Sequence, residues 1–107
     1  MPLPKRVKVG PFTYEVKLGG PEFAEDTRLL GHCDHRKLEI ALLPGLADDA
    51  TVEVLLHEIL HACFNAVGQP LEFVHKDAEE KAVVALAPIL LQVLRANPAV
   101  LEYLGVK

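Results

Sequence analysis

Hydrophobic residues in the first part of the chain recur with a period of two. They fall on alternate positions on both sides of a Gly-Pro pair, at Val7, Val9, Phe12, Tyr14, Val16 and Leu18. Alternation places such side chains on one face of a strand, and Gly-Pro is a turn signal. The pattern therefore predicts a β-hairpin, followed by an acidic loop with the sequence GGPEFAED.

A second β segment is expected in RLLGHCDHRKLEIALL, which holds one or two more short strands. The turn lies near CDHRK, where Asp34 can shape it by bonding to the backbone, and a strand covers Leu38 to Leu42. PGLADDA is then a loop, and its Asp48 or Asp49 can cap the helix that follows.

The hydrophobic period changes to three and four between residues 49 and 67, which predicts a helix. Its apolar positions are Val52, Leu55, Leu56, Ile59, Leu60, Cys63, Phe64 and Val67. Gly68 and Pro70 are the stop signal. A second helix is expected over residues 77–96, and Pro88 must kink or split it, because proline removes a helical hydrogen bond.

A short third helix is expected at the end of the chain, with Asn97 as N-cap, Pro98 at the first helical position and Gly105 as the stop. Strands thus precede helices, which is typical of an α+β fold. We expect a small antiparallel N-terminal sheet packed on two main helices. A chain of 107 residues, 50% of them hydrophobic, suits a single domain over residues 1–107.

Charge and composition narrow the possible partners. The formal net charge of −4 disfavours binding to nucleic acid phosphates, and the basic cluster Lys5, Arg6 and Lys8 is interpreted as a solvated strand face. Two cysteines do not form a disulfide scaffold. The opening residues lack the apolar region of a signal peptide, and no apolar stretch spans a bilayer without a charge or proline. We expect a cytoplasmic protein without membrane partners, and the sequence leaves its oligomeric state open.

The candidate chemistry lies in the first long helix, where His57-Glu58-Ile59-Leu60-His61 fits the pattern H-E-x-x-H. Residues four apart share one face of a helix, so the two imidazoles can bind one Zn²⁺. Glu58 is then placed to accept a proton from water and to pass it to a leaving amine. Because the segment is otherwise apolar, burying these three side chains without a metal or partner is unfavourable.

A zinc site needs a third protein ligand. Glu79 and Glu80 lie in the first turn of the second predicted helix. Glu80 shares a face with apolar residues and can point inward with them, at Val83, Ala87 and Leu91. Glu79 suits the helix dipole better, although it remains possible as a ligand. We favour Glu80.

Other polar groups have less defined roles. His75, in the connector between the two helices, is a candidate ligand or transition-state donor, and Tyr103 is a second candidate donor. The cluster His32, Cys33, Asp34 and His35 is interpreted as strand and turn, because no C-x-x-C pair accompanies it. Cys33 can also approach the zinc as a blocking thiolate.

TVEVLLHEILHACF followed by EEKAVVALAPILLQVLRANP resembles small phage- and prophage-encoded zinc metallopeptidase-like proteins, minimal zincins related to the ImmA/IrrE-type peptidases. The likeness extends through GHCDHRKLEIAL and VGPFTYEVKL and covers most of the chain, but only H-E-x-x-H and the later glutamate are specific. The resemblance implies zinc bound by His57, His61 and a glutamate on the next helix, which matches Glu80 best. It also implies Glu58 as the catalytic base.

Our first hypothesis is a gluzincin-type zinc metallopeptidase, a hydrolase whose peptide or protein substrate is bound by strand addition along Leu38 to Leu42. The alternative is a catalytically silent, zinc-stabilised protein-binding module of phage origin. A third hypothesis is a metal-free helical core domain. None of the three fixes the identity of a substrate.

Overall fold

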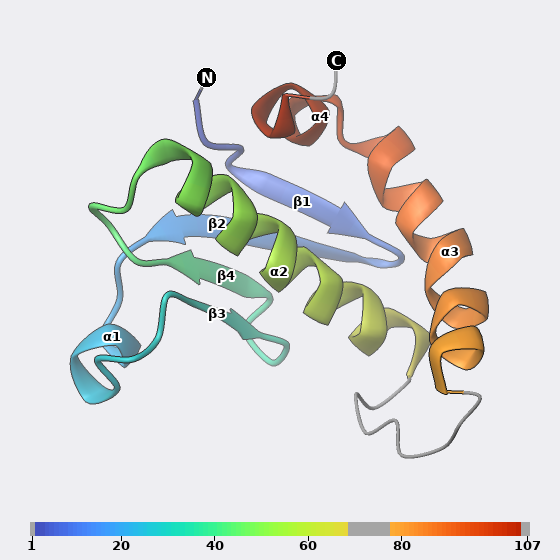
Figure 1. Cartoon of the computed structure of the whole chain (residues 1–107), viewed down its shortest axis with the longest axis horizontal. Helices are drawn as coiled ribbons and strands as arrows, with labels where there is room; N and C mark the ends of the chain where they lie inside the picture. The colour runs from blue at the N-terminus through green and yellow to red at the C-terminus, as the bar shows by residue number, and fades with distance from the viewer. Residues whose placement is uncertain (1, 69–77, 106–107) are drawn as a thin grey trace.

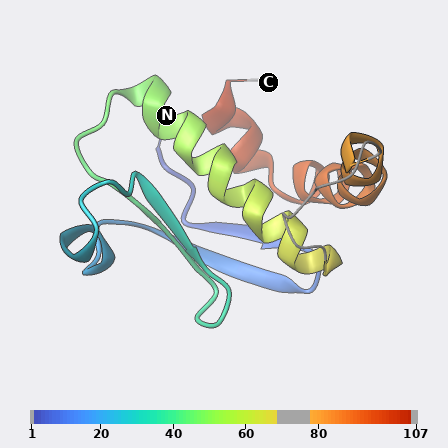
Figure 2. The same cartoon turned by 60° about the horizontal axis from the view of Figure 1, so that its bottom comes forward.

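The computed structural model describes residues 2–68 and 78–105, and the side chains of residues 78–81, 83, 84 and 87 lie outside that description. It confirms an α+β fold. The elements in chain order are β1 (Arg6–Val9), β2 (Phe12–Leu18), α1 (Glu22–Glu25), β3 (Gly31–Asp34), β4 (Glu39–Leu42), α2 (Asp48–Val67), α3 (Ala78–Ala96) and α4 (Pro98–Leu104). Helix α2 lies across one face of the sheet (Figures 1 and 2).

The sheet is mixed, so the prediction of an antiparallel sheet is only partly right. The strand order is β1-β2-β4-β3. β1 and β2 form the predicted antiparallel hairpin, and β3 pairs antiparallel with β4. β4, however, lies parallel to β2, with Val16 opposite Ile40 and Leu18 opposite Leu42. The short helix α1, within the segment expected to be a loop, belongs to the connection that makes this parallel pairing possible.

β4 has a neighbouring strand on each side. The prediction that the segment Leu38 to Leu42 is an open edge for a peptide is therefore wrong. The turn before it is as expected, because Asp34 Oδ1 accepts hydrogen bonds from the backbone N–H of Arg36 at 2.9 Å and of Lys37 at 3.0 Å. Leu38 closes the turn at a φ of 56°, a conformation that non-glycine residues rarely adopt.

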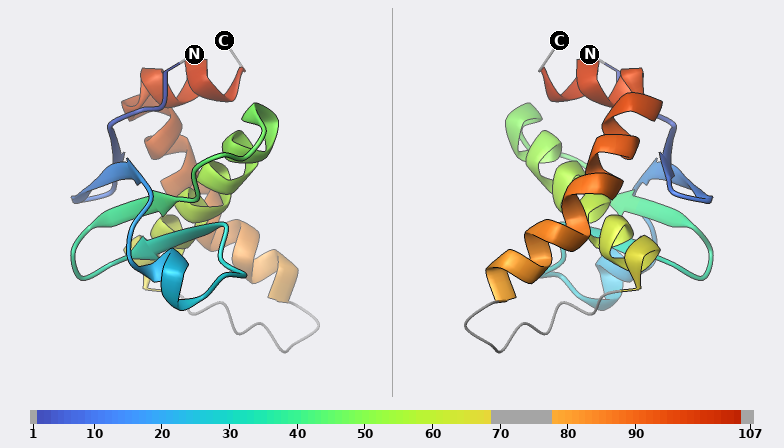
Figure 3. Two further views of the ribbon diagram at one scale, coloured as in Figure 1. Left: turned by 90° about the vertical axis from the view of Figure 1, so that its left-hand side faces the viewer. Right: turned by 90° about the vertical axis from the view of Figure 1, so that its right-hand side faces the viewer.

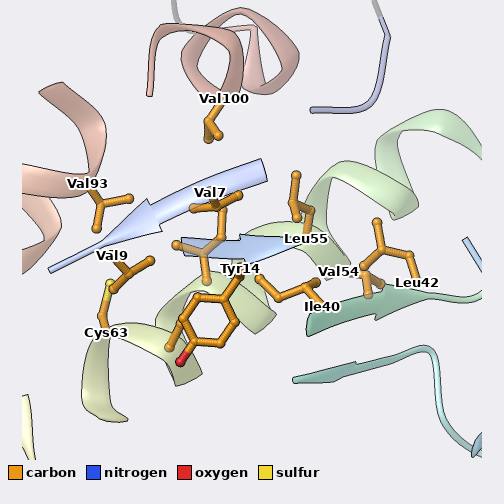
Figure 4. Packing of buried hydrophobic residues seen from close by; sticks show 12 residues of the cluster. Val7, Val9, Tyr14, Ile40, Leu42, Val54, Leu55, Cys63, Val93 and Val100 are labelled. Carbon is orange, nitrogen blue, oxygen red and sulfur yellow. The ribbon is translucent and has the colours of Figure 1, made fainter. Parts of the chain in front are cut away.

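The core lies between the sheet and the helices (Figure 4). The side chains that alternate along β1 and β4 meet the apolar face of α2, and Val93 of α3 and Val100 of α4 complete the cluster. Cys63 is fully buried, as expected for a small core residue. Arg6 and Lys8 alternate with the buried valines of β1 and are exposed to solvent. This confirms the prediction that the basic cluster forms a solvated face of a strand.

Helix α2 ends as predicted, because Gly68 takes a left-handed conformation with φ of 70°. Its start differs from the prediction. Ala47 is the N-cap, and Asp48 and Asp49 lie within the first turn without a side-chain cap bond. By length and composition α2 could cross a membrane, but the core helix of a globular domain meets the same test, so this is weak evidence.

Helix α3 continues through Pro88 and is not split. It contacts α2 and β1, and α4 follows it (Figure 3). α4 has the predicted Pro98 start and Gly105 stop. Asn97 occupies the N-cap position, but its side chain makes no cap bond.

Instead, Asn97 closes the edge of β1. Its Nδ2 donates to the carbonyls of Lys8 at 2.9 Å and Val93 at 2.7 Å, and its Oδ1 accepts from Lys8 N–H at 2.9 Å. Gln92 Oε1 accepts from Gly10 N–H at 2.9 Å. Helix α3 and its end therefore satisfy backbone groups of one sheet edge, whereas no strand of the described residues pairs with the outer edge of β3.

Candidate metal centre

Helix α2 brings the two predicted histidine ligands together. His57 and His61 lie four residues apart, and their Nε2 atoms are 3.1 Å from each other. The two rings meet edge to face, with centroids 4.8 Å apart. Both Nε2 atoms therefore converge on one point beside the helix.

This geometry fits a zinc ion. Two nitrogens that each lie about 2.0–2.1 Å from one tetrahedral ion are about 3.3–3.4 Å apart, so the pair needs only a small adjustment. Burial, with smaller contributions from His57 and His35, lowers the pKa of His61. The neutral imidazole that results is the form that binds a metal.

Glu58 is buried, with 6% of its surface exposed. Burial raises the pKa of its carboxyl, while His57 and His32 act in the opposite direction. His57, by contrast, is exposed, and His61 is half-buried. The expected cost of burying the motif therefore applies to Glu58 and in part to His61, but not to His57. A carboxylate with a raised pKa is a stronger base, which suits proton transfer near neutral pH.

Gly31 of β3 allows the sheet to approach this carboxylate. A Cβ atom at Gly31 would lie 2.6 Å from Val54 Cγ1 and 2.9 Å from Glu58 Oε2. Real Cβ contacts are longer than this, so only glycine fits here without movement. Gly31 therefore allows β3 to lie close to the face of α2 that carries Glu58.

A cavity of about 300 Å³ joins the H-E-x-x-H motif to β3 and the turn after it. Its walls are Leu29, Gly31, His32, Cys33, His35, His57, Glu58 and His61. The cluster from His32 to His35 has the predicted secondary structure, because its first three residues belong to β3 and His35 to the turn after it. His32, Cys33 and His35 nevertheless line the same cavity as the motif. Sequence reasoning had considered this for Cys33 but missed it for the two histidines.

Cys33 is a poor thiolate in this structure. Burial, and then the charges of Glu58 and Asp34, raises the pKa of its thiol to about 12. The side chain stays protonated at neutral pH and lies 3.7 Å from His35 Nδ1. Without a metal, the structure therefore favours a thiol at this position over the blocking thiolate considered from sequence.

The side chain predicted as the third ligand, Glu80, lies outside what the structure describes. Within the described residues, no three side chains of His, Cys, Asp or Glu are close enough to share a metal ion. Glu80 and Glu79 occupy the first turn of α3, a helix that contacts α2, but their side chains are outside the described set, as is His75 entirely. Both glutamates thus remain predictions from sequence.

Tyr103, proposed from sequence as a transition-state donor, is not brought to the motif. It lines a separate cavity of about 410 Å³ at the N-terminal end of α2, together with Asp48 and Val52. Burial, and then the charge of Asp48, raises the pKa of its hydroxyl.

Comparison of the chain with protein-family models, with curated proteins and with solved structures finds no match in any of the three. The likeness to phage zinc peptidases therefore rests on the sequence motifs alone. The function has to be argued from the side chains of the cavity.

Proposed function

We propose that this protein is a zinc-dependent metallopeptidase of the gluzincin type, a minimal relative of the phage-encoded zincins that its motifs resemble. The observation that supports this best is the 3.1 Å separation of the His57 and His61 Nε2 atoms, beside the buried Glu58 of the same cavity. His57, His61 and Glu80 would hold the ion.

A zinc ion so held polarises a carbonyl and lowers the pKa of a bound water to about 7. Glu58 accepts the proton of the water that attacks the scissile carbonyl carbon. It then passes that proton to the amide nitrogen as the carbon–nitrogen bond breaks. The raised pKa of Glu58 favours the first transfer, since a more basic carboxylate holds the proton better.

The substrate that suits this arrangement is an extended peptide. β3 is the sheet edge beside the cavity, and residues Gly31 to Cys33 belong both to that edge and to the cavity wall. A peptide that adds to β3 as a further strand passes the His57–His61 pair. Strand addition is thus proposed at β3 in place of β4, and we propose that the protein acts in the cytoplasm.

The alternative function is a catalytically silent zinc module that binds another protein. It needs the metal for its fold but has no use for a base at Glu58. The metal-free hypothesis is less favoured. It accounts for the 3.1 Å separation of the Nε2 atoms as a hydrogen bond between the two rings, but it gives no role to the buried Glu58 carboxylate in the same cavity.

Glu58→Gln tests the enzymatic proposal. The amide is close in size to the carboxylate but cannot accept the proton, so cleavage of an unfolded protein or peptide library should fall about 10²–10⁴-fold. Zinc content should stay at the wild-type level, because Glu58 is not a proposed ligand. If the variant cleaves as fast as wild type, the mechanism is wrong. If wild type with bound zinc cleaves nothing, the binding module is favoured.

A further inference from the structure

His35 lies next to the metal pair without joining it. It occupies the turn between β3 and β4 and lines the cavity that holds His57, Glu58 and His61. It is near enough to disfavour the positive charge on His61. Yet within the described residues no third side chain is close enough to share an ion with the pair. A substrate group in this cavity, which His35 and the His57–His61 pair both line, can contact both.

A hydrogen-bond chain favours one tautomer of His35, the one with its hydrogen on Nε2. Asn65 Nδ2 donates to the hydroxyl oxygen of Tyr14 at 3.3 Å. An amide nitrogen only donates, so the hydroxyl hydrogen of Tyr14 is free to go to His35 Nδ1, 3.0 Å away. The neutral ring then carries its hydrogen on Nε2.

Tyr14 is a rigid anchor for this chain. It is fully buried in the core (Figure 4). Its ring meets that of His35 edge to face, at an interplanar angle of 86°. Burial raises the pKa of its hydroxyl, so Tyr14 keeps the hydrogen that it gives to Nδ1. A core residue of β2 and a residue of α2 thus orient an exposed side chain at the cavity.

We propose that His35 is the transition-state donor of the peptidase, and that its Nε2–H hydrogen-bonds to the oxygen of the scissile carbonyl. Tyr14 and Asn65 are positioning residues that hold the Nε2–H tautomer. His35 transfers no proton: water oxygen bonds to the carbonyl carbon, Glu58 moves the proton to the leaving amine, and the carbon–nitrogen bond breaks. This role rests on the proposed peptidase function.

The expected effect is that of an oxyanion donor. Such a donor stabilises charge that develops on the oxygen mainly in the transition state, so its loss lowers kcat more than it raises KM. Removal of one donor of this kind costs about 10²–10³-fold in kcat. We therefore expect His35→Ala to lower kcat by that factor and to change KM only a few-fold.

The first test uses nitrogen-15 NMR on the metal-free protein and needs no catalysis. In wild type, His35 should carry its hydrogen on Nε2, and Tyr14→Phe should shift the ring toward the Nδ1–H tautomer. A wild-type His35 with its hydrogen on Nδ1 overturns the proposal. So does a tautomer left unchanged by Tyr14→Phe combined with Cys33→Ala, which also removes the thiol 3.7 Å from Nδ1.

The second test measures kcat, KM and zinc content with the same peptide library. His35→Ala should lose kcat and keep its zinc, His35→Gln should recover part of the loss through its amide N–H, and Arg36→Ala, in the same turn, is the matched control expected to stay near wild type. If wild type cleaves and His35→Ala cleaves equally well, His35 is not the donor and the peptidase proposal stands. If zinc-loaded wild type cleaves nothing, both proposals fall.

Discussion

At the scale of single residues, the site depends on how closely β3 approaches α2. Glu58 is buried against Gly31, which has no side chain to separate the two elements. The same contact keeps the carboxylate in the wall of the cavity and out of bulk water, and this burial is the main cause of its raised pKa. Gly31, which is not part of the H-E-x-x-H pattern, thus contributes to the raised pKa of Glu58, which is.

Gly31→Ala tests this contact. The new Cβ would lie 2.6 Å from Val54 Cγ1, so we expect a loss of about 1–3 kcal/mol in the free energy of unfolding, measured by urea denaturation. Val54→Ala should relieve the clash, so the cost of Gly31→Ala should be smaller in that background. Equal costs in the two backgrounds would show that the clash is absent.

Sequence reasoning identified His57, Glu58 and His61 because helical spacing alone places residues four apart on one face. It missed His35 and Gly31, because their roles depend on strand order. Only when β3 lies at the sheet edge beside α2 does the turn after it reach the cavity. The register, which the structure supplies, puts Cys33 opposite the buried Ile40 and therefore on the α2 face of the sheet.

At the scale of elements, the two edges of the sheet differ. The backbone of β1 bonds to Asn97, and Gly10 in the turn after β1 bonds to Gln92, whereas β3 has no further strand beside it within the described residues. This difference leaves the edge next to the motif available to a peptide. The sequence predicted that Asn97 caps α4, because an asparagine before Pro98 is typical of an N-cap. The same asparagine can instead bond to the edge of β1, and only the tertiary contact with β1 shows that it does so.

Asn97→Asp tests the closed edge. The carboxylate cannot donate to the carbonyls of Lys8 and Val93, and the site is only 7% exposed. We expect a loss of about 2–3 kcal/mol in the free energy of unfolding by urea denaturation. Gln92→Ala, which removes the single bond to Gly10, is the milder comparison at about 0.5–1.5 kcal/mol. An Asn97→Asp variant as stable as wild type would refute this role for Asn97.

At the scale of the whole molecule, periodicity predicted the elements and their order well, with the hairpin, α2, α3 and α4 near their expected bounds. It did not predict the parallel pairing of β2 and β4, since strand direction depends on the connection through α1 and not on alternation. The topology matters for function. It buries β4, leaves β3 at the edge and brings the turn after β3 to the cavity that His57 and His61 line.

The most direct test of the zinc site is the metal content of purified protein by elemental analysis, for wild type, Glu80→Ala and Glu79→Ala. We expect about one zinc ion per chain in wild type and in Glu79→Ala, and lost or weakened binding in Glu80→Ala, because two histidines alone leave the site without its third protein ligand. Wild-type protein that holds no zinc even after titration would contradict the metal site, and the proposed peptidase with it.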